Sequence, residues 1–312
     1  MPCTVLESLA LLGTPFIELP SRVTAQVFGV RYVQVVAESG DELFLTERGW
    51  PWLRELLPER WYCNGYYRTT GVRLGFSTGT VYRVRLIEPR RLEVVVKFSR
   101  IGQHLERGRL TQALAGDPDY DPSFGSPFEE IAMLERLRTQ TAGPRVLTKR
   151  ALAVLSPSEC FEDWELGRVT HCFQRHARRL NDDQSQLDAS RRVALKRHCD
   201  YLIVYQWMRG LNLEECIERG IVDHIEADAI NRMVQDDLHR AGFDVLDHKP
   251  NHVILSPRRD GSLLKRHGRV VYGLADFELL VPRSVSVTPS PRALATNVAD
   301  HVTAPQSCES IV

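Results

Sequence analysis

Two short stretches in the C-terminal half constrain this chain more than any other feature. Residues 245–255 carry Asp247, and residues 273–280 carry Asp276. Phosphoryl transfer uses two acids of this kind: one receives the proton of the acceptor hydroxyl, and the other holds magnesium against the nucleotide phosphates. The pair could serve phosphoryl transfer, and a resemblance in the residues around the two acids assigns the first role to Asp247 and the second to Asp276.

The first stretch resembles the catalytic loop of the protein-kinase-like superfamily. Asp247-x-Lys249-Pro250-x-His252 is similar to the Asp-x-Lys-Pro-x-Asn of many bacterial and eukaryotic kinases, and some lipopolysaccharide heptose kinases also carry His at the last position. The resemblance implies ATP as phosphoryl donor and Mg²⁺ or Mn²⁺ as metal. It also implies that Asp247 positions the acceptor hydroxyl and that Lys249 neutralises the transferring phosphoryl group.

Three residues depart from the family pattern. Val245 replaces the structural His of the loop, His252 replaces the Asn that binds the second metal, and Glu278 replaces the Gly of Asp-Phe-Gly. An imidazole nitrogen suits transition metals better than magnesium. Because Glu278 lies two residues after Asp276, an extended backbone would turn both carboxylates to one side, and Glu278 is a candidate third metal ligand. The alternative is a solvated Glu278 and a His252 that only hydrogen-bonds within the loop.

Upstream, further kinase-like motifs follow in the expected order. Residues 75–84, with Gly75, Gly79 and Val81, resemble the glycine-rich loop that closes over ATP phosphates. Lys97, 18 residues after Gly79 at the end of an apolar strand, resembles the lysine that grips the α and β phosphates. The alternatives are an ordinary hairpin with glycines in its turn and a solvated lysine at a strand edge.

The next two segments complete the expected nucleotide pocket. Residues 128–137 have the period of an amphipathic helix, on which Glu130 is the predicted partner of Lys97 and Glu129 the alternative. Residues 201–210 form an apolar run that ends in Gly and resembles the adenine-binding hinge. The resemblance puts Tyr205 at the gatekeeper position and the backbone from Gln206 to Met208 at the adenine edge. The alternative interpretations are a solvated glutamate on the helix surface and a core strand that binds no ligand.

The predicted fold class is α+β: a two-lobed, protein-kinase-like fold with an antiparallel N-lobe sheet and a reduced helical C-lobe. Residues 1–65, with strands around a turn at 38–41 and a short helix at 50–61, form an extension of unknown role. The predicted N-lobe is 66–205, with a basic insertion at about 157–199. A helix at 225–241 belongs to a truncated C-lobe, 206–285, and the proline-containing segment 286–312 is a flexible tail.

The basic insertion admits two interpretations. Its arginines and lysines either lie on the solvated surface of a helical pair or form a binding surface for a phosphorylated or acidic partner. Its histidines and cysteines match no standard zinc finger, so zinc binding is a minor alternative (His171, Cys172, His176, His198, Cys199).

Bulk properties exclude some classes of function. The formal net charge is zero, so neither specific nucleic-acid binding nor attraction to anionic membranes is expected. Seven scattered cysteines argue for reduced thiols, no apolar stretch is long enough to span a bilayer, and the N-terminus has no basic leader. We therefore expect a cytoplasmic protein.

The sequence predicts an atypical kinase that moves the γ-phosphoryl group of ATP to a hydroxyl of an unidentified protein or small-molecule acceptor. Two alternatives stay open: a pseudokinase that acts as a nucleotide-binding regulatory or scaffolding module, and a transferase that binds ATP inverted and moves the nucleotidyl group to protein.

Overall fold

A computed structural model of the chain describes residues 3–75, 79–86, 91–100, 126–139, 146–159, 161, 200–245, 248–276 and 280–283. Residues 1–282 form one compact unit. This unit contains both extended sheets and helices, so the predicted α+β class is confirmed. Within the described ranges, no helix combines the length and the hydropathy needed to cross a bilayer.

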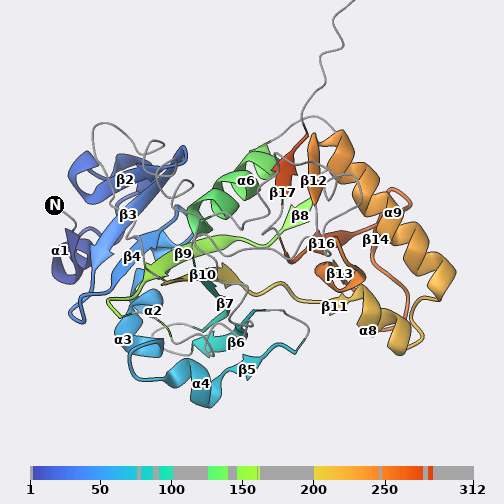
Figure 1. Ribbon diagram of the computed structural model, residues 1–312, viewed down its shortest axis with the longest axis horizontal. Coiled ribbons are helices and arrows are strands. Elements are labelled where there is room, and N and C mark those ends of the chain that lie inside the picture. Colours follow the sequence, from blue (N-terminus) through green and yellow to red (C-terminus); the bar gives the residue numbers. More distant parts are fainter. Residues whose placement is uncertain are drawn as a thin grey trace, which may run out of the picture. The chain divides into compact units, whose positions relative to one another are not determined.

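Nine strands form the large sheet of this unit (Figure 1). Its order is β1-β3-β4-β9-β10-β7-β6-β5, with β2 paired to β3, and every pair except β1–β3 is antiparallel. The strands are β1 Cys3–Thr4, β2 Thr24–Val27, β3 Val30–Val36, β4 Glu42–Leu45, β5 Val72–Arg73, β6 Val81–Leu86, β7 Leu92–Arg100, β9 Ala151–Ser156 and β10 Asp200–Gln206. The N-terminal strands thus continue the sheet that contains the predicted lysine strand.

The central strands are apolar because the sheet is covered on both faces. Successive side chains of a strand point to opposite faces. On β10, Tyr201, Ile203 and Tyr205 pack with helix α6, Pro127–Thr139, whereas Leu202 and Val204 pack with a second cluster that contains Trp61. A strand buried on both faces cannot alternate with polar residues, which explains the continuous apolar run.

Short helices supply the second cluster. They are α1 Val5–Ala10, η1 Phe16–Glu18, η2 Ser21–Val23, η3 Trp50–Trp52, α2 Leu53–Leu56, α3 Pro58–Trp61 and α4 Tyr66–Thr70. The expectation of a single helix at 50–61 was wrong. Pro58 disfavours a helical backbone at the residue before it, and Leu57 adopts φ −57° and ψ 131°, which separates α2 from α3.

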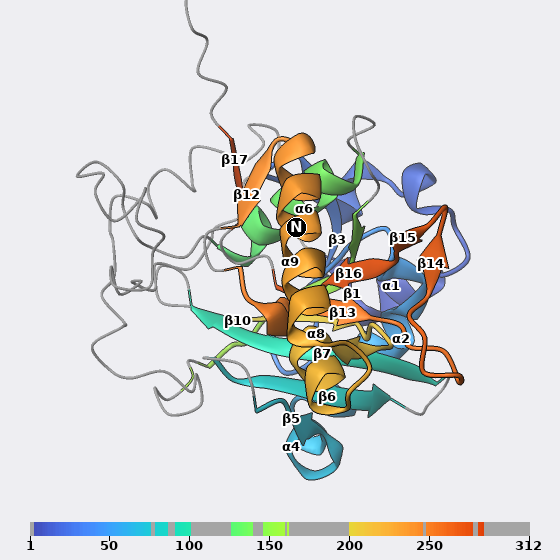
Figure 2. The same ribbon diagram turned by 90° about the vertical axis from the view of Figure 1, so that its right-hand side faces the viewer.

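A four-stranded sheet, β11-β13-β16-β8, forms the other part of the unit. Its strands are β8 Leu147–Thr148, β11 Leu211–Asn212, β13 Val253–Leu255 and β16 Tyr272–Leu274. Two further pairs join β12 Phe243–Val245 to β17 Leu280–Pro282 and β14 Lys265–Arg266 to β15 Arg269–Val270. Helix α8, Leu213–Glu218, packs on β13, and α9, His224–Arg240, packs on β12 (Figure 2).

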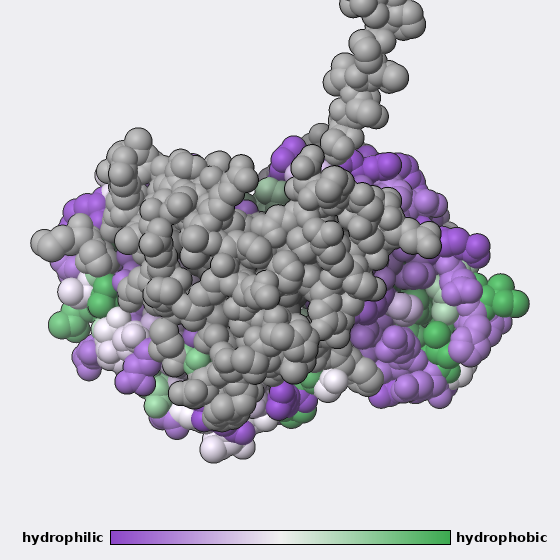
Figure 3. Space-filling view, in the orientation of Figure 1, coloured by the Kyte–Doolittle hydropathy of each residue, from purple (hydrophilic) through white to green (hydrophobic). Residues whose placement is uncertain are grey.

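The boundaries of α9 follow its capping residues. Asp223 accepts a hydrogen bond from Glu226 N at 2.7 Å, and Gly242 adopts φ +78° just after the helix ends. The buried stripe of α9 contains Ala227, Ile230 and Val234, spaced three or four residues apart. The region around α9 shows mostly hydrophilic residues on its surface (Figure 3).

Two of the chain's passages between the sheets lie side by side. Lys149 and Arg150 connect β8 to β9, and residues 207–210 connect β10 to β11. The two crossings are bonded to each other, because Gln206 N donates to Arg150 O at 2.9 Å. The side chains at these crossings are therefore held between the sheets.

Candidate functional site

A cavity of about 270 Å³ lies at the two crossings. The nine-stranded sheet and the loop before β6 contribute Arg73, Leu74, Gly75, Val81, Val95 and Lys97 to its lining. The end of β10, the two crossings, the smaller sheet and the segments next to it contribute Lys149, Gln206, Trp207, Met208, Gly210, Asn212, Glu215, Asn251, His252, Ile254, Ala275 and Asp276. The wall therefore combines apolar side chains from both sheets with a few charged groups, as small-molecule sites commonly do.

Lys97 lies in the interior of β7, not at its end. Its neighbours across the sheet are Val81 on β6 and Ile203 on β10, and only 6% of the residue is exposed. The alternative of a solvated edge lysine is therefore wrong. Burial of an ammonium group is unfavourable unless it is paired, and Lys97 Nζ lies 3.4 Å from Glu130 Oε2 and 3.1 Å from Asp276 Oδ1.

The two adjacent glutamates of α6 have different tasks. Glu130 is buried, and besides contacting Lys97 it accepts a hydrogen bond from Tyr205 Oη at 2.6 Å through Oε1. Glu129 instead accepts from Ser126 N at 2.6 Å, while Glu129 N donates to Ser126 Oγ at 3.2 Å. This reciprocal pair is a capping box at the helix N-terminus. Glu130 is therefore the glutamate that meets Lys97, and Glu129 stabilises the helix start.

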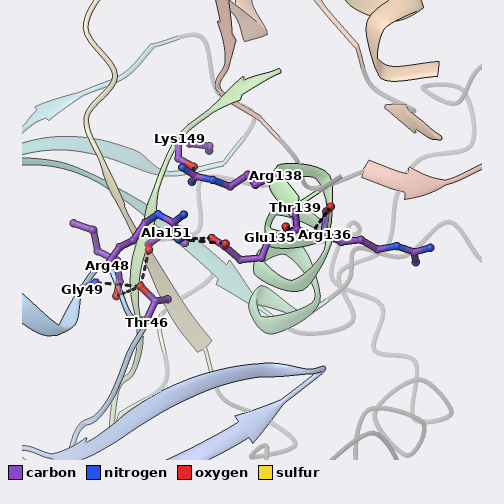
Figure 4. Close-up of polar contacts among 10 residues, drawn as sticks. Thr46, Arg48, Gly49, Glu135, Arg136, Arg138, Thr139, Lys149 and Ala151 are labelled. Carbon is purple, nitrogen blue, oxygen red and sulfur yellow. Dashed lines mark hydrogen bonds and ion pairs between the residues drawn. The ribbon is translucent and has the colours of Figure 1, made fainter. Parts of the chain in front are cut away.

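Polar contacts fix α6 on the sheet (Figure 4). Arg48 Nη1 lies 3.2 Å from Glu135 Oε2, and Arg138 Nη1 donates to Lys149 O at 3.2 Å. Thr46 Oγ1 ties the segment before Arg48 to β9 by donating to Ala151 O at 2.7 Å. The orientation of Glu130 therefore depends on contacts that reach back into the first 65 residues.

Asp276 follows β16 and faces two basic side chains. Oδ1 is near Lys97, and Oδ2 lies 3.8 Å from His252 Nε2. Burial alone would raise the pKa of this carboxyl group, but the charges of Lys97, His252 and Lys149 outweigh burial and hold the pKa well below its usual range. Asp276 is therefore ionised at neutral pH.

The turn before β13 brings His252 to the cavity. Pro250–His252 forms the short helix η6, in which His252 N donates to Lys249 O at 3.0 Å. Ala275 N donates to His252 O at 2.9 Å, which couples the turn to the segment of Asp276. Next to it, the buried Asn251 Oδ1 has no hydrogen-bond partner among the described residues.

The crossing after β10 contains the residues that were expected to form an adenine-binding hinge. Gln206, Trp207 and Met208 all line the cavity, and Trp207 N donates to Glu93 O at 2.9 Å. The Arg83 guanidinium lies 4.3 Å from the centre of the Trp207 ring. Both contacts tie the crossing to β6 and β7.

Among the predicted site residues, the structure brings seven to the cavity wall: Gly75, Val81, Lys97, Gln206, Met208, His252 and Asp276. Glu130 joins them through Lys97. Gly79 and Lys249 are described but do not line the cavity. Asp247 and Glu278 lie outside the described residues, as does nearly all of the basic insertion with its histidines and cysteines.

Sequence reasoning missed Lys149. Only 7% of this residue is exposed, and it lines the cavity with Lys97 and Asp276. The available signal was weak: a lysine two residues before an apolar run, Ala151–Ser156, usually lies at a solvated strand end. Asn251 was also missed, because the resemblance to the kinase catalytic loop assigns a metal ligand only to the next position, that of His252.

The chain matches no protein-family model and no curated protein. Among solved structures, WaaP in complex with acyl carrier protein aligns with a TM-score of 0.30 and 13% identity over 69% of this chain and 62% of WaaP. Rad53 1–466 in complex with AMP-PNP aligns with a TM-score of 0.27 and 13% identity over 80% of this chain and 61% of Rad53.

A third structure is the Rv3197–erythromycin complex from Mycobacterium tuberculosis, with a TM-score of 0.25 and 14% identity over 73% of this chain and 48% of that protein. The chain thus spans less than two thirds of each of these three proteins. Because all three TM-scores are below 0.5, we base the function on the side-chain geometry of the cavity.

Proposed function

We propose that this protein is an ATP-dependent phosphotransferase of the protein-kinase-like type that moves the γ-phosphoryl group to a hydroxyl of an acceptor. The observation that carries the proposal is the meeting of Lys97, Glu130 and Asp276 from three distant segments. Active kinases need the strand lysine paired with a helix glutamate and the metal-binding aspartate in place. A group at a cavity whose pKa is shifted by burial and by specific charge partners, as that of Asp276 is, is a candidate for a functional site.

The order of elements supports the same proposal. The chain runs from the β5–β6 hairpin to the lysine strand β7, then to the glutamate helix α6, to β9 and to β10, which leads into the crossing. In the sheet these strands are ordered β5-β6-β7-β10-β9. We infer a kinase-like N-lobe from this order, with β11–β17, α8 and α9 as the reduced C-lobe and β1–β4 as an addition to the sheet edge.

Each cavity residue then has a task toward ATP. Val81, Val95 and Ile254 provide apolar surface for the adenine ring, and the backbone of Met208 lies at its polar edge. Lys97 orients the phosphates, and Glu130 with Tyr205 keeps the lysine side chain in one position. A lysine held in this way loses little further freedom when the nucleotide binds.

The donors at the cavity fit a divalent cation. Asp276 offers an ionised carboxylate, Asn251 offers a buried amide oxygen, and both are hard ligands of the kind that Mg²⁺ and Mn²⁺ prefer. Bound there, the cation would neutralise charge on the phosphates. In the described ranges no three His, Cys, Asp or Glu side chains form a metal cluster. Glu278 and His252 are the further ligands that we propose.

Asp247 and Lys249 complete the proposed mechanism. Asp247 would accept the proton of the acceptor hydroxyl, and Lys249 would neutralise the phosphoryl group during transfer. General-base catalysis of this kind contributes roughly 10²–10⁴-fold to the rate. We therefore expect Asp247→Asn to bind ATP normally and to lose transfer by about that factor.

One observation favours a pseudokinase as the second candidate. Both carboxylate oxygens of Asp276 already face basic side chains of the protein, at 3.1 and 3.8 Å. An aspartate engaged in this way competes with a metal for the same oxygens. In that case the cavity would bind nucleotide without turnover.

Labelled ATP separates the candidates. The protein is incubated with ATP labelled at either the α or the γ phosphate, with Mg²⁺ or Mn²⁺, and with Lys97→Ala and Asp276→Ala as matched variants. Transfer of γ label that both variants abolish supports the phosphotransferase. Transfer of α label supports the nucleotidyl transferase, and ATP binding without transfer supports the pseudokinase. Equal thermal stabilisation of all three proteins by ATP and metal would contradict a nucleotide site at this cavity.

A further inference from the structure

Lys149 is anchored through its backbone where the two sheets meet. The preceding strand β8 pairs in parallel with β16, with Thr148 opposite Leu274. Its own carbonyl accepts from Arg138 Nη1 on α6 at 3.2 Å (Figure 4). The next carbonyl, of Arg150, accepts from Gln206 N at 2.9 Å. Lys149 is therefore fixed relative to α6, to the second crossing and to the strand that leads to Asp276.

The side chain of Lys149 is buried against the ring of Tyr205. Its Nζ lies 4.1 Å from the ring centre, within the range of a cation–π interaction. The hydroxyl of the same tyrosine donates to Glu130, the partner of Lys97. Tyr205 thus connects the two buried lysines of the cavity, one through its face and the other through its hydroxyl.

The two lysines share the cavity wall with one carboxylate. Lys97, Lys149 and Asp276 all line the cavity, and Lys97 Nζ lies 3.1 Å from Asp276 Oδ1. Lys149 is 7% exposed and lies at the cavity wall, so an anionic ligand that enters the cavity would meet its charge away from bulk water. Phosphate oxygens form strong charge-assisted hydrogen bonds with lysine.

We propose that Lys149 is a second phosphate-binding lysine, which contacts phosphoryl oxygens of the bound nucleotide together with Lys97. The proposal rests on the proposed nucleotide site and adds a binding residue to it. The ammonium group of Lys149 acts as a point charge, so Lys149 would recognise the phosphates and not the base or the ribose. The competing role is structural, in which Lys149 only supports the ring of Tyr205.

Calorimetry with ligands of different charge tests the proposal. Dissociation constants for ATP, ADP, adenosine and inorganic pyrophosphate are measured for wild type, Lys149→Met and Lys149→Arg, with EDTA and with Mg²⁺. We expect Lys149→Met to weaken ATP and ADP roughly 10- to 100-fold, the effect of losing a hydrogen bond to a charged group. Adenosine should bind within about twofold of wild type, and Lys149→Arg should retain most of the affinity for ADP.

Arg150→Met is the matched control. It removes a positive charge from the neighbouring residue, whose side chain is exposed, and should leave all four dissociation constants unchanged. Equal loss for ADP and adenosine in Lys149→Met would show a structural role and overturn the proposal, as would unchanged ADP binding. If Lys149→Met does not fold, Lys149→Gln, which keeps a long polar side chain, is measured in its place.

Pyrophosphate distinguishes failure of this proposal from failure of the proposed function. If the wild-type protein binds pyrophosphate but no nucleotide, and Lys149→Met loses the pyrophosphate, the nucleotide site is wrong and Lys149 remains an anion-binding residue. If the wild type binds nucleotide and Lys149→Met binds it equally well, the nucleotide site stands and the role of Lys149 is wrong. If the wild type binds neither ligand, both are wrong.

Discussion

Arg48 Nη1 lies 3.2 Å from Glu135 Oε2, so an ion pair joins the first 65 residues to the helix that carries Glu130. The two side chains are 35% and 24% exposed. An ion pair this accessible to water contributes at most about 1 kcal/mol. The stronger link between the same elements is apolar: the Phe128 ring lies 5.4 Å from the ring of Tyr32 and 5.1 Å from that of Phe44.

We therefore predict unequal effects of two substitutions at this junction. Arg48→Ala should lower the free energy of unfolding by less than about 1 kcal/mol. Phe128→Ala, which leaves a cavity among fully buried rings, should lower it by about 3–5 kcal/mol. Urea denaturation of both variants measures the two values, with Arg54→Ala, at an exposed position of α2, as the control. A larger effect for Arg48→Ala would mean that charge, and not packing, holds α6.

Two glycines at the cavity should respond differently to alanine. Gly210 adopts φ +150°, and an added Cβ would collide with the backbone oxygen of Leu255. At Gly273 the added Cβ would meet the flexible end of the Met208 side chain. Backbone cannot move aside cheaply, whereas a methionine can change rotamer.

Gly210→Ala should therefore lower stability by more than about 1 kcal/mol. Gly273→Ala should change stability little and should instead alter ATP affinity, because Met208 lines the cavity. Thermal unfolding and ATP titration of both variants check this contrast. Gly261→Ala is the control for a positive φ with open space, since φ is +83° and nothing lies near its added Cβ. If Gly210→Ala and Gly261→Ala lose equal stability, the backbone near Leu255 moves to remove the collision, and the prediction for Gly210 is wrong.

The pH dependence of stability should reveal Asp41. Burial would raise the pKa of Asp41, but hydrogen bonds from Ser39 Oγ and Ser158 N, both at 2.7 Å, lower it below the ordinary value of 3.8. A carboxylate with a lowered folded-state pKa stabilises the protein above the unfolded-state pKa, and this stability is lost as pH falls through the folded-state value.

Asp41→Asn should accordingly be less stable than wild type at pH 7, by about 1–3 kcal/mol. The difference should shrink as pH falls below about 4, where the unfolded chain becomes protonated. Denaturation curves between pH 7 and pH 3 measure it, with Asp228→Asn on the exposed face of α9 as the control. A difference that stays constant over this range would exclude ionisation of Asp41 as its source.

Local patterns predicted much of the fold. The periods of three to four residues indicated α6 and α9, and the apolar runs indicated β7 and β10 within a few residues of their observed ends. The meeting of Lys97 with Glu130 was predicted from a resemblance. A local pattern also distinguishes the two glutamates, because Ser126-x-x-Glu129 is the sequence of a capping box, and the capping hydrogen bonds are present.

Non-local pairing explains what the sequence did not reveal. Strand β4 joins the sheet through β9, with Phe44 opposite Val154, more than 100 residues later in the chain. The sequence of 1–65 alone therefore suggested a separate extension. Lys149 was missed for the same physical reason: its burial arises from Tyr205 and from β16, the strand that pairs with β8, and neither Tyr205 nor β16 is near it in sequence.

The last prediction concerns metal choice at His252. Its Nε2 lies 3.8 Å from Asp276 Oδ2, close enough for a single cation to contact both side chains after a small movement. An imidazole nitrogen binds Mn²⁺ better than it binds Mg²⁺, for which oxygen ligands are strongly preferred. We therefore predict that Mn²⁺ supports turnover better than Mg²⁺ in the wild-type protein.

Exchanging the ligands should reverse this preference. His252→Asn with Glu278→Gly introduces the Asn and the Gly of the kinase motifs that the sequence resembles, and should raise turnover with Mg²⁺ relative to Mn²⁺. Each single variant shows which residue is responsible, and His267→Asn, at an exposed turn, is the control. Turnover is measured across a range of both metals for all five proteins. If the ratio of Mn²⁺ to Mg²⁺ activity is the same in the wild type and the double variant, neither His252 nor Glu278 selects the metal. Asp276 and the amide oxygen of Asn251 would then be the ligands to vary next, because both line the same cavity.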